Sequence, residues 1–426
     1  MYTIKKINFL IFLVLISIGY PQGRMNSYGL GHYYSNQGAR NAVDGLSALS
    51  PTISNNISFS NPSTWHHLNY TYLSLSYSGE QNSLNDHSNV NGYSGLSEAM
   101  LIIPIKSKFS LGFSLSPYIN QKVNLQDKDT LTFLAFDDTL NISRLFFRSG
   151  GVMAFNFGAS YKINQKISFG ILNNVLFGSS RQSELINFGG NNIVQSARNR
   201  YNGLISSSFA SIKLSDNIKF YTSYKITIKP LESAYKEKYL FDDANSNGYH
   251  DWSAPYFDFP FPDSVNIISE DRIGDLHKPT SYIIGIDRRF GKWSALSFEY
   301  FTQIENSLNI KNIYIPTSNW IDKTRSLKFL YSKYANQISL KLFDKISFRS
   351  GILYSSHYLG KDNVELIEYG WSIGSGFKFK RFGNQIDLNY YFGFREYPGT
   401  IEKEIIQQIQ FGVSIGDIWF IKRRQK

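Results

Sequence analysis

The sequence predicts an all-β protein: a fourteen-stranded antiparallel transmembrane β-barrel of a Gram-negative outer membrane, with an N-terminal plug in its lumen. Three observations carry this prediction: a composition rich in aromatic residues, alternation of polar and apolar side chains, and an ordered series of connections. Aromatic residues make up 16% of the 426 residues, charged residues only 18%, and Cys is absent. This composition favours strands over packed helices, and the absence of Cys excludes a disulfide framework.

Alternation with a period of two runs through many segments of the chain. In residues 218–229, apolar or aromatic side chains alternate with lysines and small polar residues, and 109–116 and 386–395 repeat this pattern. Successive side chains of a strand point to opposite faces, so each segment has one apolar and one polar face. A soluble β-sandwich would alternate in the same way, so the connections must decide between the two.

The candidate strands number fourteen, and short turns alternate strictly with longer connections between them. The strands are predicted at 69–79, 95–104, 108–118, 144–163, 166–179, 198–214, 218–230, 280–290, 293–304, 325–341, 345–358, 364–379, 384–396 and 404–421. Long loops are predicted at 80–94, 119–143, 180–197, 231–279, 305–324, 359–363 and 397–403. Short turns at one rim and long loops at the other are the layout of an outer-membrane barrel with its short turns and C-terminus in the periplasm.

The first 23 residues have the pattern of a secretory signal peptide. Lys5 and Lys6 precede an apolar run from Ile7 to Ile18 that is short for a transmembrane helix. We predict cleavage near Gln22 or Gly23, and the alternative is a retained membrane anchor. No other stretch of about 18 apolar residues exists that would span a membrane as a helix.

Residues 24–68 precede the first strand and are rich in Gly, Ser and Asn, with only short apolar pieces. Such a segment could hang free in the periplasm or fold into the lumen as a plug, because a barrel of this width is otherwise open. Within it, Ala39 to Leu49 could form a short helix. The barrel itself is predicted over residues 69–426.

Two short motifs carry a resemblance to a known family. The motif "SFSNPSTW" (Ser58 to Trp65) resembles the Asn-Pro-Ala hatch of the FadL/OmpP1/TodX outer-membrane transporters, with Asn61 and Pro62 matching and Ser63 in place of the usual Ala. The ending "FGVSIGDIWFIKRR" (Phe411 to Arg424) is similar to the last strand of FadL-like proteins from Bacteroidetes. The resemblance implies fourteen strands, an N-terminal plug and movement of long-chain fatty acids or other hydrophobic molecules. PorV-like relatives of similar plan, in type IX secretion, imply instead a partner for secreted proteins.

Charged residues fall on the polar face of several predicted strands. Those expected to face the lumen are Lys219, Lys225, Lys229, Glu299, Lys328, Arg349, Asp387 and Arg395. A basic excess in a narrow interior would attract an anionic head group. The alternative is that these residues solvate the wall and pair with the plug, because every such barrel has a polar interior.

Three further motifs favour structural interpretations. "GWSIG" (Gly370 to Gly374) fits the serine-hydrolase pattern but lies within a strand, whereas the nucleophile elbow needs a strand, a sharp turn and a helix. The adjacent His66 and His67 lack a third metal ligand at useful spacing. "KRRQK" at the C-terminus is a periplasmic tail near anionic lipid rather than a nucleic-acid patch. We therefore expect neither an enzyme nor a nucleic-acid partner.

The loop 231–279 contains "FDDANSNGYHDW" (Phe241 to Trp252), whose spacing resembles a calcium-binding loop. The ligands would be the side chains of Asp243, Asn245, Asn247 and Asp251 and the carbonyl of Tyr249. Position 12 is Ala254 instead of a bidentate Glu, so Ca²⁺ in the 243–254 loop would bind near the millimolar range. The alternative is an Asx-rich turn without an ion.

The sequence predicts passive uptake of a hydrophobic or amphipathic small molecule. The alternative is a non-enzymatic secretion or surface-assembly scaffold whose long loops bind a protein partner. The other expected partners are outer-membrane lipid and lipopolysaccharide, whose phosphates would be repelled by the acidic 231–279 loop unless divalent cations intervene.

Overall fold

The computed structural model describes most of the chain downstream of residue 23. The described residues are 24–34, 41–54, 56–84, 90–106, 108–126, 131–135, 138–188, 191–242, 252–253, 255–257, 269–313, 317–336, 339, 341–379, 384–397 and 403–417. The predicted signal peptide lies outside them. No helix in these residues is long and apolar enough to cross a membrane.

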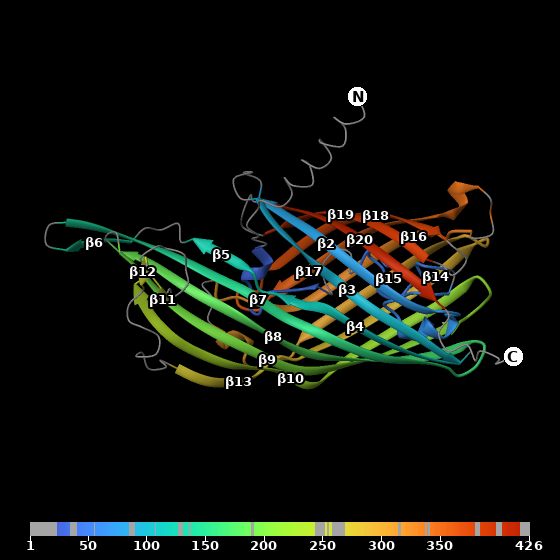
Figure 1. Ribbon diagram of the computed structural model, residues 1–426, viewed down its shortest axis with the longest axis horizontal. Coiled ribbons are helices and arrows are strands. Elements are labelled where there is room, and N and C mark those ends of the chain that lie inside the picture. The colour runs from blue at the N-terminus through green and yellow to red at the C-terminus, as the bar shows by residue number, and fades with distance from the viewer. Residues whose placement is uncertain are drawn as a thin grey trace, which may run out of the picture.

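Fourteen strands form one closed antiparallel barrel, as predicted (Figure 1). They are β2 (Thr71–Leu84), β3 (Val90–Lys106), β4 (Phe109–Asn120), β7 (Asp138–Lys162), β8 (Ile167–Phe188), β9 (Asn191–Lys213), β10 (Ile218–Asp242), β14 (Pro279–Phe290), β15 (Ser294–Glu305), β16 (Ile321–Lys333), β17 (Ile346–Leu359), β18 (Glu365–Phe379), β19 (Asn384–Glu396) and β20 (Lys403–Asp417). Each pairs with the next, and β2 pairs with β20 to close the ring. Closure leaves no open sheet edge.

Shorter elements complete the fold. The 3-10 helices are η1 (Arg24–Ser27), η3 (Pro62–His67), η4 (Ile310–Asn312) and η5 (Leu342–Lys345). The minor strands are β1 (His32–Tyr33), β5 (Val123–Gln126), β6 (Leu131–Ala135), β11 (Trp252–Ser253), β12 (Tyr256–Phe257) and β13 (Ser269–His277). β1 pairs with β4, β5 and β6 pair with β7, and β13 pairs with the far part of β10.

The outer face of the barrel is apolar and the inner face is polar. On β8, for example, Ile167, Phe169 and Ile171 are exposed, whereas the intervening Ser168 is buried. This inversion of the usual soluble pattern suits a surface that contacts lipid, and the alternation in the sequence reports it.

Strands β7 to β10 extend well beyond this apolar belt. They contain 25, 22, 23 and 25 residues, whereas about 9–11 residues cross the membrane. Their far ends form a wall that projects on the left of Figure 1. We call this part the projecting wall: residues 138–150 of β7, 178–188 of β8, 191–203 of β9 and 229–242 of β10, together with β13.

Several predicted loops are partly strand. Residues 80–84 and 90–94 belong to β2 and β3, residues 138–143 belong to β7, and all described residues of 180–197 belong to β8 and β9. The predicted loop 231–279 is too long, because residues 231–242 belong to β10 and residues 269–277 form β13. Beyond the membrane the outward side chains meet water instead of lipid and need not be apolar, so the alternation that marks a strand weakens although the backbone pairing continues. Two smaller predictions were also wrong: β16 ends at Lys333, not at 341, and the described residues of 39–49 form turns rather than a helix.

Candidate functional site: the barrel lumen

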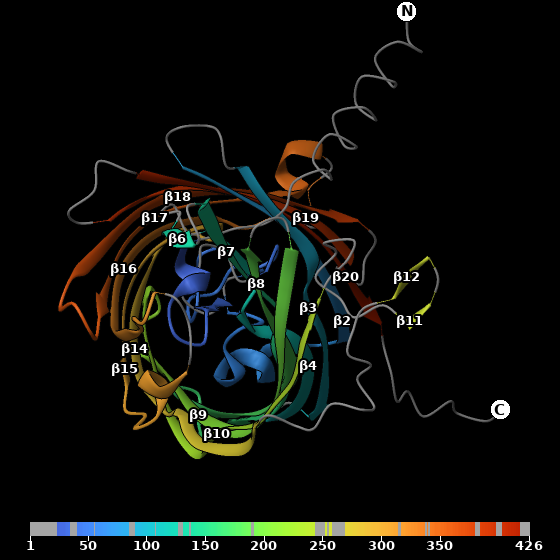
Figure 2. The ribbon, with the colours of Figure 1, turned by 90° about the vertical axis from the view of Figure 1, so that its left-hand side faces the viewer.

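The described residues of 24–68, here the N-terminal segment, lie inside the ring of strands and are mostly buried (Figure 2). The Asn-Pro-Ser motif stands at the start of the 3-10 helix η3 in this segment. Asn61 caps η3 by accepting from the backbone N–H and hydroxyl of Ser63, at 3.1 and 2.7 Å, and Pro62 occupies the first helical position. Both residue types are favoured at these positions.

The barrel wall is recessed where η3 packs against it. A Cβ atom on Gly112 would lie 2.4 Å from the Trp65 ring, and one on Gly170 would lie 2.5 Å from the Ser63 nitrogen. The Trp65 indole N–H donates to the Phe59 carbonyl at 2.9 Å. Glycines on the polar face of the strands therefore create the space in which the segment docks.

Asp44 organises the interior of the N-terminal segment. Its carboxylate accepts hydrogen bonds from the backbone N–H and hydroxyl of Ser60, at 2.8 and 2.6 Å, and from the hydroxyl of Thr52 at 2.5 Å. The nearby Asn41 amide donates to Glu98 of β3 at 2.6 Å. One buried carboxylate thus folds together two pieces of chain that carry little apolar surface.

Two neighbouring barrel strands hold the same segment at residues 46–50. Glu299 of β15 accepts from the backbone N–H groups of Ala48, Leu49 and Ser50 at 2.8–3.0 Å and from the Ser47 hydroxyl at 3.1 Å. Its direct cross-strand partner Lys328 donates to the Leu46 carbonyl at 2.8 Å. These residues were predicted to face the lumen, and the structure places both against the segment.

Arg349 and Asp387 lie together on the inner wall. The Arg349 guanidinium donates to Asp387 at 2.7 Å and to the Ala42 carbonyl at 3.1 Å. Both side chains are buried, as is Lys378, which donates to the Ile53 carbonyl at 2.6 Å.

Arg395 is the centre of a three-strand row of charges. Glu368 of β18, Arg395 of β19 and Glu404 of β20 are direct cross-strand neighbours, and all three are at most 1% exposed. Arg395 donates to Glu368 at 2.8 Å and to Glu404 at 2.7 Å. Tyr391 and Tyr397 each donate to one of these carboxylates at 2.6 Å. The row therefore has alternating charge and nearly complete hydrogen bonding.

A buried cluster of side chains around His277 joins β1 to the barrel. The His277 ring stacks on Tyr33, with centroids 4.6 Å apart, and its Nε2 lies 3.0 Å from the Tyr118 hydroxyl. Its Nδ1 lies beside the Glu305 carboxylate. Every member is buried, so this cluster fixes the start of the N-terminal segment against β4, β13 and β15.

The remaining predicted lumen lysines occupy three different settings. Lys219 is buried and donates to Asn56 of the N-terminal segment. Lys225 lines a cavity. Lys229 lies at a β-bulge of β10, where its ammonium pairs with Glu232 at 3.2 Å and both side chains are about half exposed.

The imidazole rings of His66 and His67 lie next to each other, with their centroids 4.0 Å apart. Burial of the rings lowers the pKa of His66 to about 4 and that of His67 to about 3, with a smaller contribution from nearby Lys162 and, for His67, from His66. Both rings are neutral at pH 7. No three His, Asp or Glu side chains in the described parts of the chain are grouped to hold a metal ion.

Of two further motifs from the sequence, "GWSIG" lies in the described part of the structure and the calcium-type loop does not. Ser372 of "GWSIG" lies within β18 and donates to Asn389 at 2.9 Å, so the local strand–turn–helix of a nucleophile elbow is absent there. The proposed calcium ligands fall on residues 243–251, outside the described residues.

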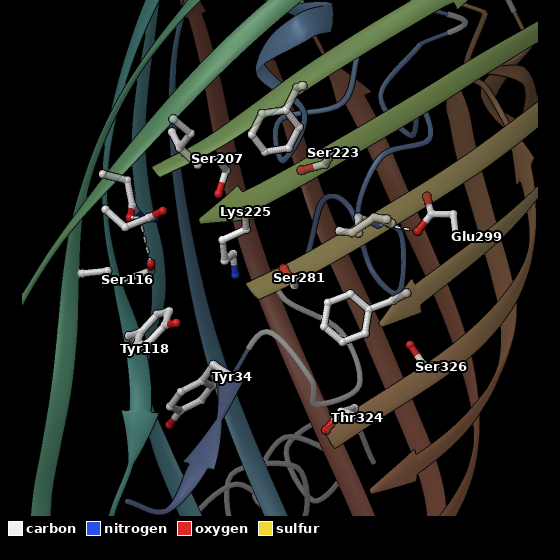
Figure 3. Close-up of a pocket in the computed structure, with 18 of the residues that line it drawn as sticks. Tyr34, Ser116, Tyr118, Ser207, Ser223, Lys225, Ser281, Glu299, Thr324 and Ser326 are labelled. Carbon is white, nitrogen blue, oxygen red and sulfur yellow. Dashed lines mark hydrogen bonds between the residues drawn. The ribbon is translucent and has the colours of Figure 1, made fainter. Parts of the chain in front are cut away.

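A cavity lies between the N-terminal segment and the wall (Figure 3), with about 90 Å³ in which the centre of a water-sized molecule fits. Lys225, Glu299, Tyr34 and Tyr118 are among the side chains around it in Figure 3. Its lining combines serines and charged groups with an apolar set: Ala154, Leu172, Phe209, Ile283, Phe301 and Leu353. The cavity therefore suits a molecule with both apolar and polar surface.

Beside this cavity, three neighbouring strands bend. β4 has a bulge between Pro117 and Ile119, and Gly150 of β7 and Gly178 of β8 have φ of 92° and 152°. Only glycine adopts such angles without strain, and a Cβ atom on either would lie 2.3 Å from a neighbouring carbonyl oxygen. The bend lies at the junction of the belt and the projecting wall.

Sequence reasoning missed Asp44, Glu368, Glu404, His277 and Glu305. The alternation of the sequence could have placed Glu368 in the lumen, because it falls on the same face of 364–379 as the small and polar residues Gly370, Ser372 and Gly374. Asp44 gave no such signal, since it lies in turns where side-chain direction has no period.

The fold defines the class: a closed fourteen-stranded barrel with an apolar outer belt and a polar lumen is an outer-membrane protein. A family model described as BamG matches residues 3–426, and the chain belongs to the BamG family. The sequence motifs did not indicate this family. No curated protein matches the chain.

Solved outer-membrane channels share the fold at low sequence identity. A FadL homologue from Pseudomonas aeruginosa is 14% identical, with a TM-score of 0.57 over 93% of this chain and 99% of that one. The CymD monoaromatic hydrocarbon channel is 13% identical, with a TM-score of 0.55 over 90% and 98%. The Pseudomonas putida toluene transporter TodX is 14% identical, with a TM-score of 0.51 over 90% and 98%. The predicted likeness to FadL- and TodX-type barrels is confirmed for the fold.

Proposed function

We propose that this barrel is a channel for passive uptake of hydrophobic or amphipathic small molecules, with the N-terminal segment as its plug. The observation that carries the proposal is the cavity of mixed lining beside the bend in β4, β7 and β8. The fold likeness to a monoaromatic hydrocarbon channel and a toluene transporter supports the same class of substrate. Long-chain fatty acids, which combine an apolar chain with a carboxylate, are one such substrate.

In the proposed path, substrate enters from the exterior end, occupies the cavity, and continues when the plug moves near Asn61 and Pro62. Lys225 would orient an anionic group, because a cation in a narrow polar lumen focuses the field on an approaching anion. Leu172, Phe209 and Phe301 would contact the apolar part of the substrate.

The test is uptake into liposomes that contain the purified protein, with labelled toluene and a labelled long-chain fatty acid as probes. Leu172→Trp fills the cavity and is expected to reduce uptake of both probes at least severalfold. Ile171→Trp is the matched control, because Ile171 is on the same strand and exposed on the outer belt. Unfolding in detergent reports whether either variant disturbs the barrel. Uptake equal to that of empty liposomes, or unchanged by Leu172→Trp in a folded barrel, contradicts the proposal.

A second candidate is a scaffold that binds a secreted or surface protein. The observation that favours it is the projecting wall, which extends far beyond what membrane crossing needs, combined with a lumen tightly bonded to the N-terminal segment. A photo-crosslinker at Ser183, on the wall, is expected to yield one discrete partner in intact cells, whereas a photo-crosslinker at the exposed Lys166, at the opposite rim, should not. If no discrete product forms, the scaffold candidate fails.

A further inference from the structure

The outer face of the projecting wall carries a concentrated positive charge. Strand register places Arg181 of β8, Arg198 of β9 and Lys236 of β10 directly opposite one another. The adjacent row toward the membrane contains Ser179, Arg200, Ala234 and Arg272 across β8, β9, β10 and β13. All five basic side chains are exposed. We call them the cationic patch: Arg181, Arg198, Arg200, Lys236 and Arg272.

Within the described residues, the patch is largely uncompensated. Lys236 pairs with Glu270 at 2.6 Å, with both side chains about half exposed. Within the described part of the chain, Arg181, Arg198, Arg200 and Arg272 form no ion pair. Like charges placed directly opposite on a sheet repel each other, so this arrangement is unfavourable without an external anion.

The height of the cationic patch above the apolar belt indicates which anions lie next to it. Phe177 is the last exposed aromatic residue of the belt on β8, and Ser179 and Arg181 follow at the next two outward positions. Two residues along a strand span about 7 Å, and strands of such barrels tilt by about 45°, so the two rows stand roughly 5 and 10 Å above Phe177. A bilayer adds about 5–8 Å of headgroup on each side of its hydrocarbon core. Because short turns mark the periplasmic rim, the first row lies at the outer-leaflet headgroups and the second row lies at their outer edge.

We propose that the cationic patch binds the phosphate groups of a phosphorylated outer-leaflet glycolipid of the lipopolysaccharide type. Guanidinium groups match phosphate oxygens in a bidentate geometry. The belt below the patch, with Phe177 and Phe155 exposed, contacts the acyl chains of the same lipid. Bound lipid neutralises the row of like charges and fixes the position of the barrel relative to the outer leaflet. This site is separate from the lumen and does not depend on the proposed uptake.

The test compares binding of two lipids to the detergent-solubilised full-length protein. The probes are bisphosphorylated lipid A and the same lipid with both phosphates removed, with inorganic phosphate as competitor. The test variant is Arg181→Gln/Arg198→Gln/Arg200→Gln. The matched control is Lys166→Gln/Arg288→Gln/Lys292→Gln, which removes the same charge from exposed positions at the periplasmic end. Heat-induced unfolding verifies that both variants remain barrels.

We expect bisphosphorylated lipid A to bind to the natural protein and to the control with equal, salt-sensitive affinity. Each basic residue near an anionic surface contributes about 1 kcal/mol, so the test variant should bind roughly a hundredfold more weakly. Dephosphorylated lipid A should bind about as weakly as that variant binds its phosphorylated form. Equal binding of the two lipids, or equal loss in test and control variants, overturns the proposal. Competition by millimolar inorganic phosphate that leaves no lipid preference also overturns it, because the patch would then be a general anion site.

Discussion

Two three-strand rows of charge on opposite faces of the barrel show how location decides what a charged residue does. Inside, Glu368, Arg395 and Glu404 alternate in sign and are buried and hydrogen-bonded. Outside, Arg181, Arg198 and Lys236 have the same sign and are exposed. Both rows follow from the same antiparallel register. The inner row must be neutralised within the protein because its side chains are buried away from bulk solvent. The outer row is exposed, so it can be solvated or can bind an external anion.

The comparison extends to the lumen as a whole. The buried lumen charges Glu299, Lys328, Arg349 and Lys378 reach backbone groups of the N-terminal segment. They hold a piece of chain that has too little apolar surface to fold by itself. Removing an inner charge should therefore cost much more stability than removing an outer one.

The largest effect is expected for Arg395→Met. The substitution leaves two buried carboxylates next to each other without a cation, and breaking a buried pair in this way costs roughly 3–5 kcal/mol. Urea unfolding of the barrel in detergent micelles measures the loss. Arg198→Met, in the outer row, is the control and should change the free energy of unfolding by about 0.5 kcal/mol or less. Similar losses in both variants would contradict the distinction between the rows.

The next effect concerns the attachment of the N-terminal segment. Glu299→Ala removes the acceptor for three backbone N–H groups and one hydroxyl. Hydrogen bonds to a charged group contribute about 1.5–3 kcal/mol, so amide hydrogen exchange of residues 47–50 should accelerate at least a hundredfold while the strands stay protected. Glu270→Ala, which removes an exposed partner of Lys236, is the matched control. Unchanged protection at 47–50 would show that the segment is held elsewhere.

A smaller effect is expected from acidification. The pKa values of His66 and His67 are lowered to about 4 and about 3, whereas in a released segment they return to about 6.5. Between pH 6.5 and the lowered pKa values, the released segment binds more protons than the docked one. Docking of η3 is therefore fully stable above pH 6.5 and weakens as the pH falls toward 4.

Hydrogen exchange of residues 61–68 at pH 7 and pH 5, corrected for intrinsic rates, measures this dependence. We expect protection to fall at least twentyfold at pH 5, because each histidine alone contributes roughly that factor. The double variant His66→Asn/His67→Asn should show little dependence on pH. A natural protein with equal protection at both values would rule out the histidines as the cause.

The smallest effect belongs to the exterior loop. At millimolar Ca²⁺, calorimetry is expected to show weak binding that Asp243→Ala/Asp251→Ala abolishes. Neutralising these two aspartates should raise lipid A affinity at the cationic patch only slightly. Absence of any heat that depends on these two aspartates would leave an Asx-rich turn without an ion.

The sequence predicted the barrel well because a lipid-facing strand must alternate. Residues such as Ile167, Phe169 and Ile171 face lipid, and the polar residues between them face the lumen, so the period of two is visible without a structure. The Asn61–Pro62 pair was recognisable for a similar reason, because helix capping is a local interaction. Where the outward face of a strand meets water instead of lipid, as at the described residues of 180–197, the outward side chains need not be apolar, and the prediction gave loops.

The amino-acid sequence by itself determined the class of fold, the number of strands and the polarity of the two faces. Only the tertiary structure decided which charges meet: that Glu299 binds residues 47–50 and that Arg395 lies between two carboxylates. It also decided that three basic residues far apart in the chain form one outer row. The reason is that alternation depends on neighbours along the chain, whereas pairing depends on strand register and on where the N-terminal segment docks, which no local pattern encodes.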